Sequence, residues 1–196
     1  MKGAIAAMLI AAKALKNFNM KLRGSLIIIG VIDEEVGSAG TRRLAEKGFK
    51  ADFAVVGEPT GLRIGIAHKG DATYEIVTHG KAAHSSIPEK DVNAITKMTK
   101  VTESLELYSQ RIRKKRDKIL GCPTFSIGTI KGGVTTWAVP DSCRITVDRR
   151  ILLGENSDSI ENELQKILDR LKQKDRGLIV EIHKMTDMAP MEILKG

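Results

Sequence analysis

The chain has 196 residues, of which 42% are hydrophobic and 29% are charged, and its formal net charge is +8. This length can bury a real core, and the composition excludes a disordered or membrane-embedded chain. Its two cysteines, Cys122 and Cys143, have neither CxxC nor zinc-ribbon spacing, so we expect reduced thiols and a cytoplasmic protein.

The positive charge is densest over residues 111–118, with the sequence RIRKKRDK. These residues close a long helical pattern, where cations complement the helix dipole. A nucleic-acid patch is the alternative, but no aromatic residues are interleaved to stack on bases. A solvated helix end is therefore the preferred interpretation, and we expect no nucleic-acid partner.

Residues 3–17 are alanine-rich and apolar nearly all round, which predicts a helix buried on both faces. The N-terminus also resembles a secretory signal, with one lysine before a short apolar stretch. Its charged region is thin, however, and the helical pattern continues without a break to Lys16. The stretch is too short to span a membrane, so we expect a core helix and no membrane.

The next segments predict part of a parallel α/β sheet. Residues 25–32 and 52–56 are short apolar runs typical of buried strands, and residues 41–47 between them predict a helix ended by Gly48. Two strands cannot form a stable sheet alone. Residues 1–63 therefore predict a partial α/β domain, which should leave apolar surface exposed near residues 26–32.

A different pattern begins at residue 64. An alternating strand at 73–78, a helix at 93–113, strands at 124–131 and 143–151, a helix at 157–174 and a strand at 178–182 follow one another. Ser157 or Asp158 is the expected N-cap of the second helix. The order β-α-β-β-α-β predicts a complete ferredoxin-like domain over residues 64–184. Residues 185–196 then begin a return to the first domain.

Carboxylates follow both predicted strands of the first domain. Asp33, Glu34 and Glu35 come directly after the first strand, and Glu58 comes after the second. Ligands of α/β folds bind at this edge of the sheet, and clustered carboxylates need a cation or raised pKa values. One glutamate can then bind a metal while another carries protons. A solvated acidic loop is the alternative for each segment alone.

Two further residues are candidates in the second domain. His84 lies in a loop of small residues and hydroxyls, with room to meet a substrate, although a loop histidine is commonly just exposed. Asp148, Arg149 and Arg150 end a strand, and one arginine can bind a substrate carboxylate through its two-pronged geometry. A surface salt bridge is the competing interpretation.

Five segments, in this order and spacing, resemble one family, that of the co-catalytic zinc amidohydrolases. The family includes acetylornithine deacetylase, succinyl-diaminopimelate desuccinylase, aminoacylase and carboxypeptidase G. The segments are Met1-Lys2-Gly3, residues 33–38 (DEEVGS), residues 57–60 (GEPT), residues 80–88 with Asn93-Ala94-Ile95, and Gly132-Gly133 with Val139-Pro140-Asp141.

The resemblance implies a role for each candidate. Glu34 is similar to the general base that activates a metal-bound water, and Glu35 and Glu58 resemble ligands of two zinc ions, for which cobalt is a possible substitute. His84 resembles the histidine that a partner's lid domain contributes to stabilise the oxyanion, and Arg150 the arginine that binds the substrate carboxylate. The substrate class is an N-acyl amino acid or small peptide, and the lid domain implies a homodimer.

The sequence also departs from the family. An aspartate that bridges both metals and two histidine ligands have no counterpart, so we expect an internal part of a longer hydrolase that is weakly active or inactive alone. Trp137 stands where the family usually has asparagine, and Asp91 where it has glycine. The expected fold class is thus an incomplete zinc-peptidase-like α/β domain plus a complete ferredoxin-like lid. The alternative function is a non-catalytic dimerisation module.

Overall fold

A computed structural model of the chain describes residues 2–35, 37–84 and 92–193. The chain divides into two compact units, residues Met1–Gly65 and Ile66–Gly196. Within the part of the chain that is described, no helix is long and apolar enough to cross a membrane.

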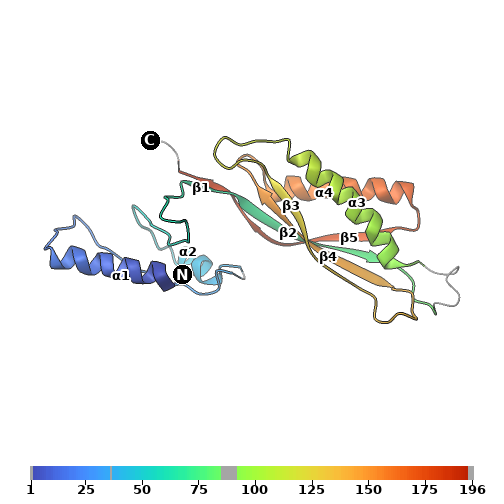
Figure 1. Ribbon diagram of the computed structural model, residues 1–196, viewed down its shortest axis with the longest axis horizontal. Coiled ribbons are helices and arrows are strands. Elements are labelled where there is room, and N and C mark those ends of the chain that lie inside the picture. The colour runs from blue at the N-terminus through green and yellow to red at the C-terminus, as the bar shows by residue number, and fades with distance from the viewer. Residues whose placement is uncertain (1, 36, 85–91, 194–196) are drawn as a thin grey trace. The chain divides into compact units, whose positions relative to one another are not determined.

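The first unit contains two helices, α1 (Lys2–Asn17) and α2 (Ala39–Glu46), at the two positions where the sequence predicts helices (Figure 1). The predicted strands are wrong, because residues 25–32 and 52–56 form no strand in the described part of this unit. A strand needs neighbours for its backbone hydrogen bonds, and the unit brings no second strand beside either segment.

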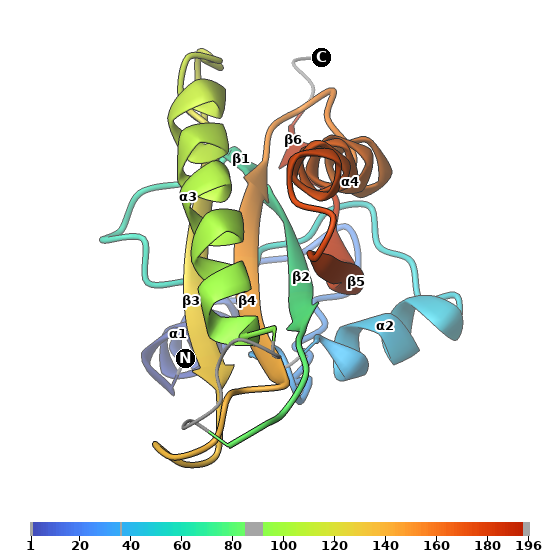
Figure 2. The ribbon, with the colours of Figure 1, turned by 90° about the vertical axis from the view of Figure 1, so that its right-hand side faces the viewer.

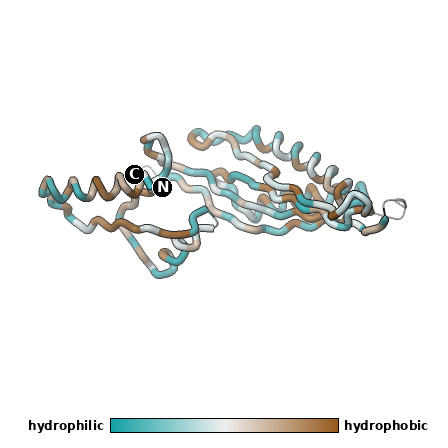
Figure 3. Tube along the Cα trace, turned by 60° about the horizontal axis from the view of Figure 1, so that its bottom comes forward, coloured by the Kyte–Doolittle hydropathy of each residue, from teal (hydrophilic) through white to brown (hydrophobic). Residues whose placement is uncertain are grey.

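Apolar surface is correspondingly exposed in this unit. None of the described residues of α1 is buried, so the prediction of a helix buried on both faces is also wrong. The large apolar side chains of residues 26–32 are between 41% and 78% exposed, which confirms the exposure expected for this segment. Figure 3 shows the hydrophobic stretches of the chain along its trace.

Close packing within the first unit occurs at two glycines. A Cβ on Gly57 would lie 2.7 Å from the Cβ of Ala4, so the segment before Glu58 runs directly against α1. A Cβ on Gly40 would lie 2.7 Å from the backbone of Ile32, where α2 begins. The unit is therefore held together locally, without a buried core among its described residues.

The second unit is built on a four-stranded antiparallel sheet with the strand order β3-β4-β2-β5. Its elements are β2 (Gly70–His79), α3 (Ala94–Ile112), β3 (Thr124–Gly132), β4 (Ser142–Ile151), α4 (Ser157–Lys174) and β5 (Ile179–Met188). Two short strands, β1 (Ala67–His68) and β6 (Met191–Glu192), pair beside the point where the chain enters and leaves the sheet. Figure 2 shows α3 and α4 on one face of this sheet.

In the two central strands, β2 and β4, buried residues alternate with more exposed ones, which explains why helices cover only one face of the sheet. In β2 and β4 every second residue is buried, among them Tyr74, Ile76, Ile145 and Val147, and these side chains pack against the helices. The intervening residues are on the opposite face, which no described helix covers. Because side chains alternate with a period of two, one face can be apolar and the other polar.

Each helix of this layer presents one apolar stripe to the sheet. Met98, Val101 and Leu105 of α3 are fully buried, as are Leu164 and Leu168 of α4. This spacing of three and four residues is the helical repeat that the sequence shows.

Both helices of the second unit begin at an asparagine. Asn93 Oδ1 accepts a hydrogen bond from the Thr96 amide at 3.1 Å, and Asn156 Oδ1 accepts one from the Ser159 amide at 2.8 Å. The predicted cap at Ser157 or Asp158 is therefore wrong by one or two residues. The Ser157 hydroxyl instead donates to Asp187 Oδ2 at 2.6 Å, which ties the start of α4 to β5.

Candidate functional site

The acidic loop of the first unit is a tight turn that leads into α2. Asp33 has a positive φ of 67°, and its carbonyl accepts a hydrogen bond from the Ser38 amide at 2.6 Å. The Ser38 hydroxyl donates to the Glu34 carbonyl at 3.4 Å, and Arg42 Nε donates to the Gly37 carbonyl at 3.1 Å. These bonds occupy backbone oxygens, and Asp33, Glu34 and Glu35 are all exposed.

Glu58 follows Gly57 in a second turn, in which the Thr60 amide donates to the Glu58 carbonyl at 2.9 Å. The side chain of Glu58 is exposed. Across the described residues of the chain, no group of three or more histidine, cysteine or carboxylate side chains is close enough to hold a metal ion. Structural and catalytic zinc sites use three or four protein ligands. The donors that the described residues bring together therefore do not fit a complete zinc site.

His84 lies in a loop held by backbone hydrogen bonds at one end of the second unit's sheet. The Gly80 amide donates to the Asp141 carbonyl at 2.7 Å, and the Val139 amide donates to the Ala83 carbonyl at 2.8 Å. His84 itself pairs with Ala138 in an isolated β-bridge. The loop is thus fixed against the segment that enters β4. Ser85 and Ser86, the hydroxyls that follow His84, lie outside the described residues, as does Asp91.

Gly80 is required at its position by close approach rather than by an unusual φ. A Cβ there would collide with the Val92 carbonyl oxygen, and it would lie 2.8 Å from the Pro140 carbonyl oxygen and 2.9 Å from the Ala94 amide. Three backbone segments therefore meet at Gly80, and only a residue without a side chain lets them do so.

A hollow of about 650 Å³ lies at this end of the unit. The beginning of α3, with Asn93 and Ile95, lines one side, and the loop from Gly132 to Pro140 lines the other. The volume lies within the range of small-molecule sites. Trp137 belongs to the same loop and is 66% exposed.

Arg149 and Arg150 are adjacent in β4 and lie on opposite faces of the sheet. Arg149 is on the helix-covered face and is fully buried, where its Nη2 bonds both carboxylate oxygens of Glu155 at 3.0 Å. Arg150 is on the open face with its side chain 49% exposed. Its Nε contacts Asp148 Oδ1 at 3.0 Å, which leaves both terminal nitrogens for a ligand. Of the two, Arg150 is the one that a substrate can reach.

The buried pair of Arg149 and Glu155 was not anticipated from the sequence. Burial raises the pKa of Glu155, but hydrogen bonds from Lys115 and the Leu152 amide and the charge of Arg149 outweigh it, so the pKa lies below its usual value. Burial also raises the pKa of the neighbouring Tyr108 to about 12. A charged residue at an inward position of an alternating strand is the one signal that would have found this pair.

His84 and Arg150 are at opposite ends of the same sheet. His79, which precedes the His84 loop, pairs with Ser142 at the start of β4, whereas Arg150 pairs with Asp71 near the end of β4. The strand from Ser142 to Arg150 spans roughly 26 Å at about 3.3 Å per residue. The two side chains of one chain therefore do not meet around one small molecule.

Known proteins are similar to this chain both in sequence and in fold. Acetylornithine deacetylase of Myxococcus xanthus is 31% identical over 166 residues, which are 83% of this chain and 44% of the relative. That of Vibrio cholerae is 33% identical over 172 residues, or 85% and 46%. Aminopeptidase PepT of Bacillus cereus has a solved structure with a TM-score of 0.73 at 23% identity, covering 100% of this chain and 50% of that one. A tripeptidase of Staphylococcus aureus gives 0.66 at 20% identity, covering 97% and 48%.

Residues 66–176 match the peptidase dimerisation domain of the M20 family. Fold and relatives together define a mixed α/β protein that is similar to known deacetylases and peptidases. More particularly, the chain belongs to the M20 peptidase family, because this domain covers more than half of it. The resemblance found in the sequence motifs is thereby confirmed. The chain spans about half the length of the relatives that it matches.

Proposed function

We propose that this chain carries the lid and part of the catalytic domain of a zinc-dependent hydrolase of amide bonds. Its substrate would be an N-acyl amino acid or a small peptide, as for acetylornithine deacetylases, and its role would lie in amino-acid metabolism. The second unit would be the lid, with the β-α-β-β-α-β order of a ferredoxin-like domain. Its two cysteines are free, which is consistent with a cytoplasmic location.

The observation that carries this proposal is the separation of His84 from Arg150. Because β4 spans roughly 26 Å from Ser142, at the end of the sheet that carries the His84 loop, to Arg150, a single small substrate can meet both residues only when two chains contribute. β3 and β5 lie at the edges of the four-stranded sheet, and an edge strand can pair across a two-fold axis. A homodimer in which His84 acts on the partner's substrate satisfies this geometry.

The residues would divide the reaction as follows. Arg150 would bind the substrate carboxylate through its two terminal nitrogens, and His84 of the partner chain would donate a hydrogen bond to the developing oxyanion. Glu34 would take the proton of the attacking water and give it to the leaving amine. Glu35 and Glu58 would supply two of the zinc ligands, and the remaining ligands are not among the donors that the described residues gather.

Zinc titration of the 196-residue chain tests the metal part of the proposal. Two monodentate carboxylates are too few for a stable site, so we expect no binding tighter than about 100 µM. A variant with Glu35 and Glu58 replaced by glutamine is the matched control. Tight binding of one or two zinc ions by the wild-type chain would refute the claim that this chain lacks enough zinc ligands.

A mixing experiment tests the site shared between chains. In the whole hydrolase, His84→Ala and Arg150→Met variants are each expected to be nearly inactive. After random exchange of subunits, half of the dimers are mixed and each has one intact site, so activity should return to about a quarter of the wild-type value. No recovery, together with exchange demonstrated by light scattering or mass spectrometry, would show that His84 and Arg150 do not share a site across the dimer.

The second candidate function is a non-catalytic dimerisation module. It is favoured because the buried core lies entirely in the second unit, among the described residues. Sedimentation of this chain at micromolar concentration and an assay of the whole hydrolase on N-acetylated amino acids separate the two candidates. A dimer whose full-length form has no activity, even with zinc supplied, favours the module, whereas a strict monomer argues against both.

A further inference from the structure

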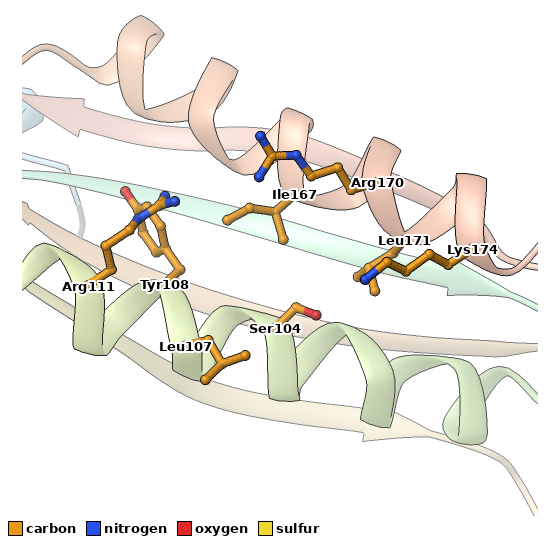
Figure 4. A pocket seen from close by; sticks show the side chains of 8 residues that line it. All are labelled: Ser104, Leu107, Tyr108, Arg111, Ile167, Arg170, Leu171 and Lys174. Carbon is orange, nitrogen blue, oxygen red and sulfur yellow. The ribbon is translucent and has the colours of Figure 1, made fainter.

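We propose that the groove between α3 and α4 binds an acidic peptide segment that carries an apolar anchor residue, a function separate from hydrolysis. The groove is lined from α3 by Ser104, Leu107, Tyr108 and Arg111, and from α4 by Ile167, Arg170, Leu171 and Lys174. Figure 4 shows these eight side chains on the two neighbouring helices, with Arg111 and Tyr108 reaching from α3 toward α4 and Ile167 from α4 toward α3.

Charge complementarity points to an acidic ligand. Three of the lining residues are cations, Arg111, Arg170 and Lys174, and none is acidic. None of the three makes an ion pair with any described residue, although Arg111 covers the Tyr108 ring at 5.4 Å. Other cations of the same helices are neutralised, since Lys97 and Lys100 both bond Asp175 and Lys172 contacts Asp169. Glu163 of α4 interacts with the Tyr108 hydroxyl at the edge of the groove, so three cations and one nearby carboxylate give the groove a net positive charge.

The floor of the groove is apolar. Leu107 is 62% exposed on its α3 side, although the other face of the same helix fills the core. Ile167 and Leu171 are partly buried against that core from α4. An apolar floor with a cationic rim is suited to a ligand that is itself amphipathic, with an aliphatic side chain placed between carboxylates.

The size of the groove suits one or two side chains of a longer peptide segment. Its volume is about 260 Å³, below the 300–1,000 Å³ of ordinary small-molecule sites. Such a hollow accepts one or two side chains of a longer segment. Single-stranded nucleic acid is disfavoured because Tyr108, the one aromatic ring among the lining residues, is only 2% exposed and cannot stack on bases.

The groove and the proposed substrate arginine are on different layers of the same unit. α3 and α4 cover one face of the sheet, whereas Arg150 projects from the face that the described helices leave open. Changes in the groove can therefore be tested without altering the residues assigned to hydrolysis.

The probe is a fluorescein-labelled peptide of sequence Glu-Leu-Glu-Glu-Leu-Glu, titrated with the 196-residue chain and followed by fluorescence anisotropy. We expect saturable binding with a Kd on the order of 100 µM. Arg170→Glu should weaken binding about ten-fold, and Lys174→Glu should do so independently. Both residues are exposed, so far-UV circular dichroism should show an unchanged fold.

The matched control is Lys166→Glu, which makes the same change of charge one turn earlier on α4. Lys166 is exposed and does not line the groove, so its substitution should weaken binding less than about three-fold. Equal effects at Lys166 and Arg170 would mean diffuse attraction to a basic surface and would overturn the proposal.

Control ligands decide the remaining alternatives. A peptide with serine in place of leucine should bind at least about five-fold more weakly, and one with lysine in place of glutamate should not bind. Equal binding of the serine peptide would show that the apolar side chain does not contribute to affinity, and this result would overturn the proposal. The proposal would also be overturned if phosphatidylserine vesicles or a single-stranded oligonucleotide bound to the chain while the acidic peptide did not.

Discussion

Replacing Glu155 by glutamine should destabilise the second unit more than any other single change in its polar network. Glu155 bonds the fully buried Arg149 through both oxygens at 3.0 Å, and one of these oxygens also accepts from the Leu152 amide at 3.1 Å. Glutamine keeps the size of the side chain, but it turns one acceptor into a donor that faces the guanidinium. The buried charge of Arg149 then has no counter-charge.

The magnitude follows from burial. Breaking a buried ion pair by removing one partner costs about 3–5 kcal/mol, and Arg149 retains the Arg150 carbonyl and a 3.4 Å contact with the Tyr108 hydroxyl. We therefore expect about 3 kcal/mol, a large share of the roughly 5–15 kcal/mol that holds a domain folded. Lys115 contacts the same carboxylate at 2.8 Å but is 51% exposed, so Lys115→Gln should cost less than about 1 kcal/mol.

Urea denaturation at pH 7, followed by far-UV circular dichroism, measures both variants. The pKa of Glu155 is lowered in the folded state, so its stabilisation is present above the ordinary glutamate pKa and is lost as pH falls through the lower folded value. The difference between wild type and Glu155→Gln should therefore shrink in acid. If Glu155→Gln cost no more than Lys115→Gln at pH 7, the buried pair would not hold this end of β4 in place.

Two further substitutions probe other parts of the second unit. Hydrogen bonds from Lys97 and Lys100 lower the pKa of Asp175 to about 2, so Asp175→Asn should cost about 1–2 kcal/mol at pH 7 and clearly less near pH 2, where about half of the carboxylate is protonated. Denaturation midpoints at the two pH values measure this, and an equal loss at both would contradict it. Gly80→Ala should cost about 1–3 kcal/mol and loosen the His84 loop, because its Cβ meets backbone oxygens. Hydrogen exchange at the Val139 amide should be faster in the variant. An exchange rate equal to that of the wild type would refute the claim that a Cβ at position 80 crowds the loop.

The elements of the second unit were largely determined by local sequence. The sequence predicts strands at 124–131 and 143–151, bounded by the turn residues Gly132-Gly133 and Pro140-Asp141, and the structure has them at Thr124–Gly132 and Ser142–Ile151. The helix predicted at 157–174 has the same bounds in the structure. The helix and the strand Ser142–Ile151 were predicted correctly because each buries one face, and the spacing of their apolar residues reflects that burial, whereas in β3 only Phe125 is buried.

The first unit shows where this reasoning fails. An apolar run such as residues 25–32 indicates burial in a sheet, but pairing depends on neighbours that no local pattern specifies. Ile27 and Ile28 remain 58% and 42% exposed, although their residue types favour a strand. The sequence determined that this segment favours a strand, and the tertiary structure decided that no neighbouring strand pairs with it.

For the candidate site residues too, the sequence and the tertiary structure each decided a different part. Sequence selected Glu34, Glu35, Glu58, His84 and Arg150 by residue type and by family resemblance, and their roles stay predictions. Only the register of β2 with β4 decided that His84 and Arg150 belong to opposite ends of one sheet. Likewise, only the strand's facing decided that Arg149 is buried while Arg150 is exposed. Adjacent residues of a strand point to opposite faces, so tertiary packing buries one arginine and leaves the other exposed to solvent.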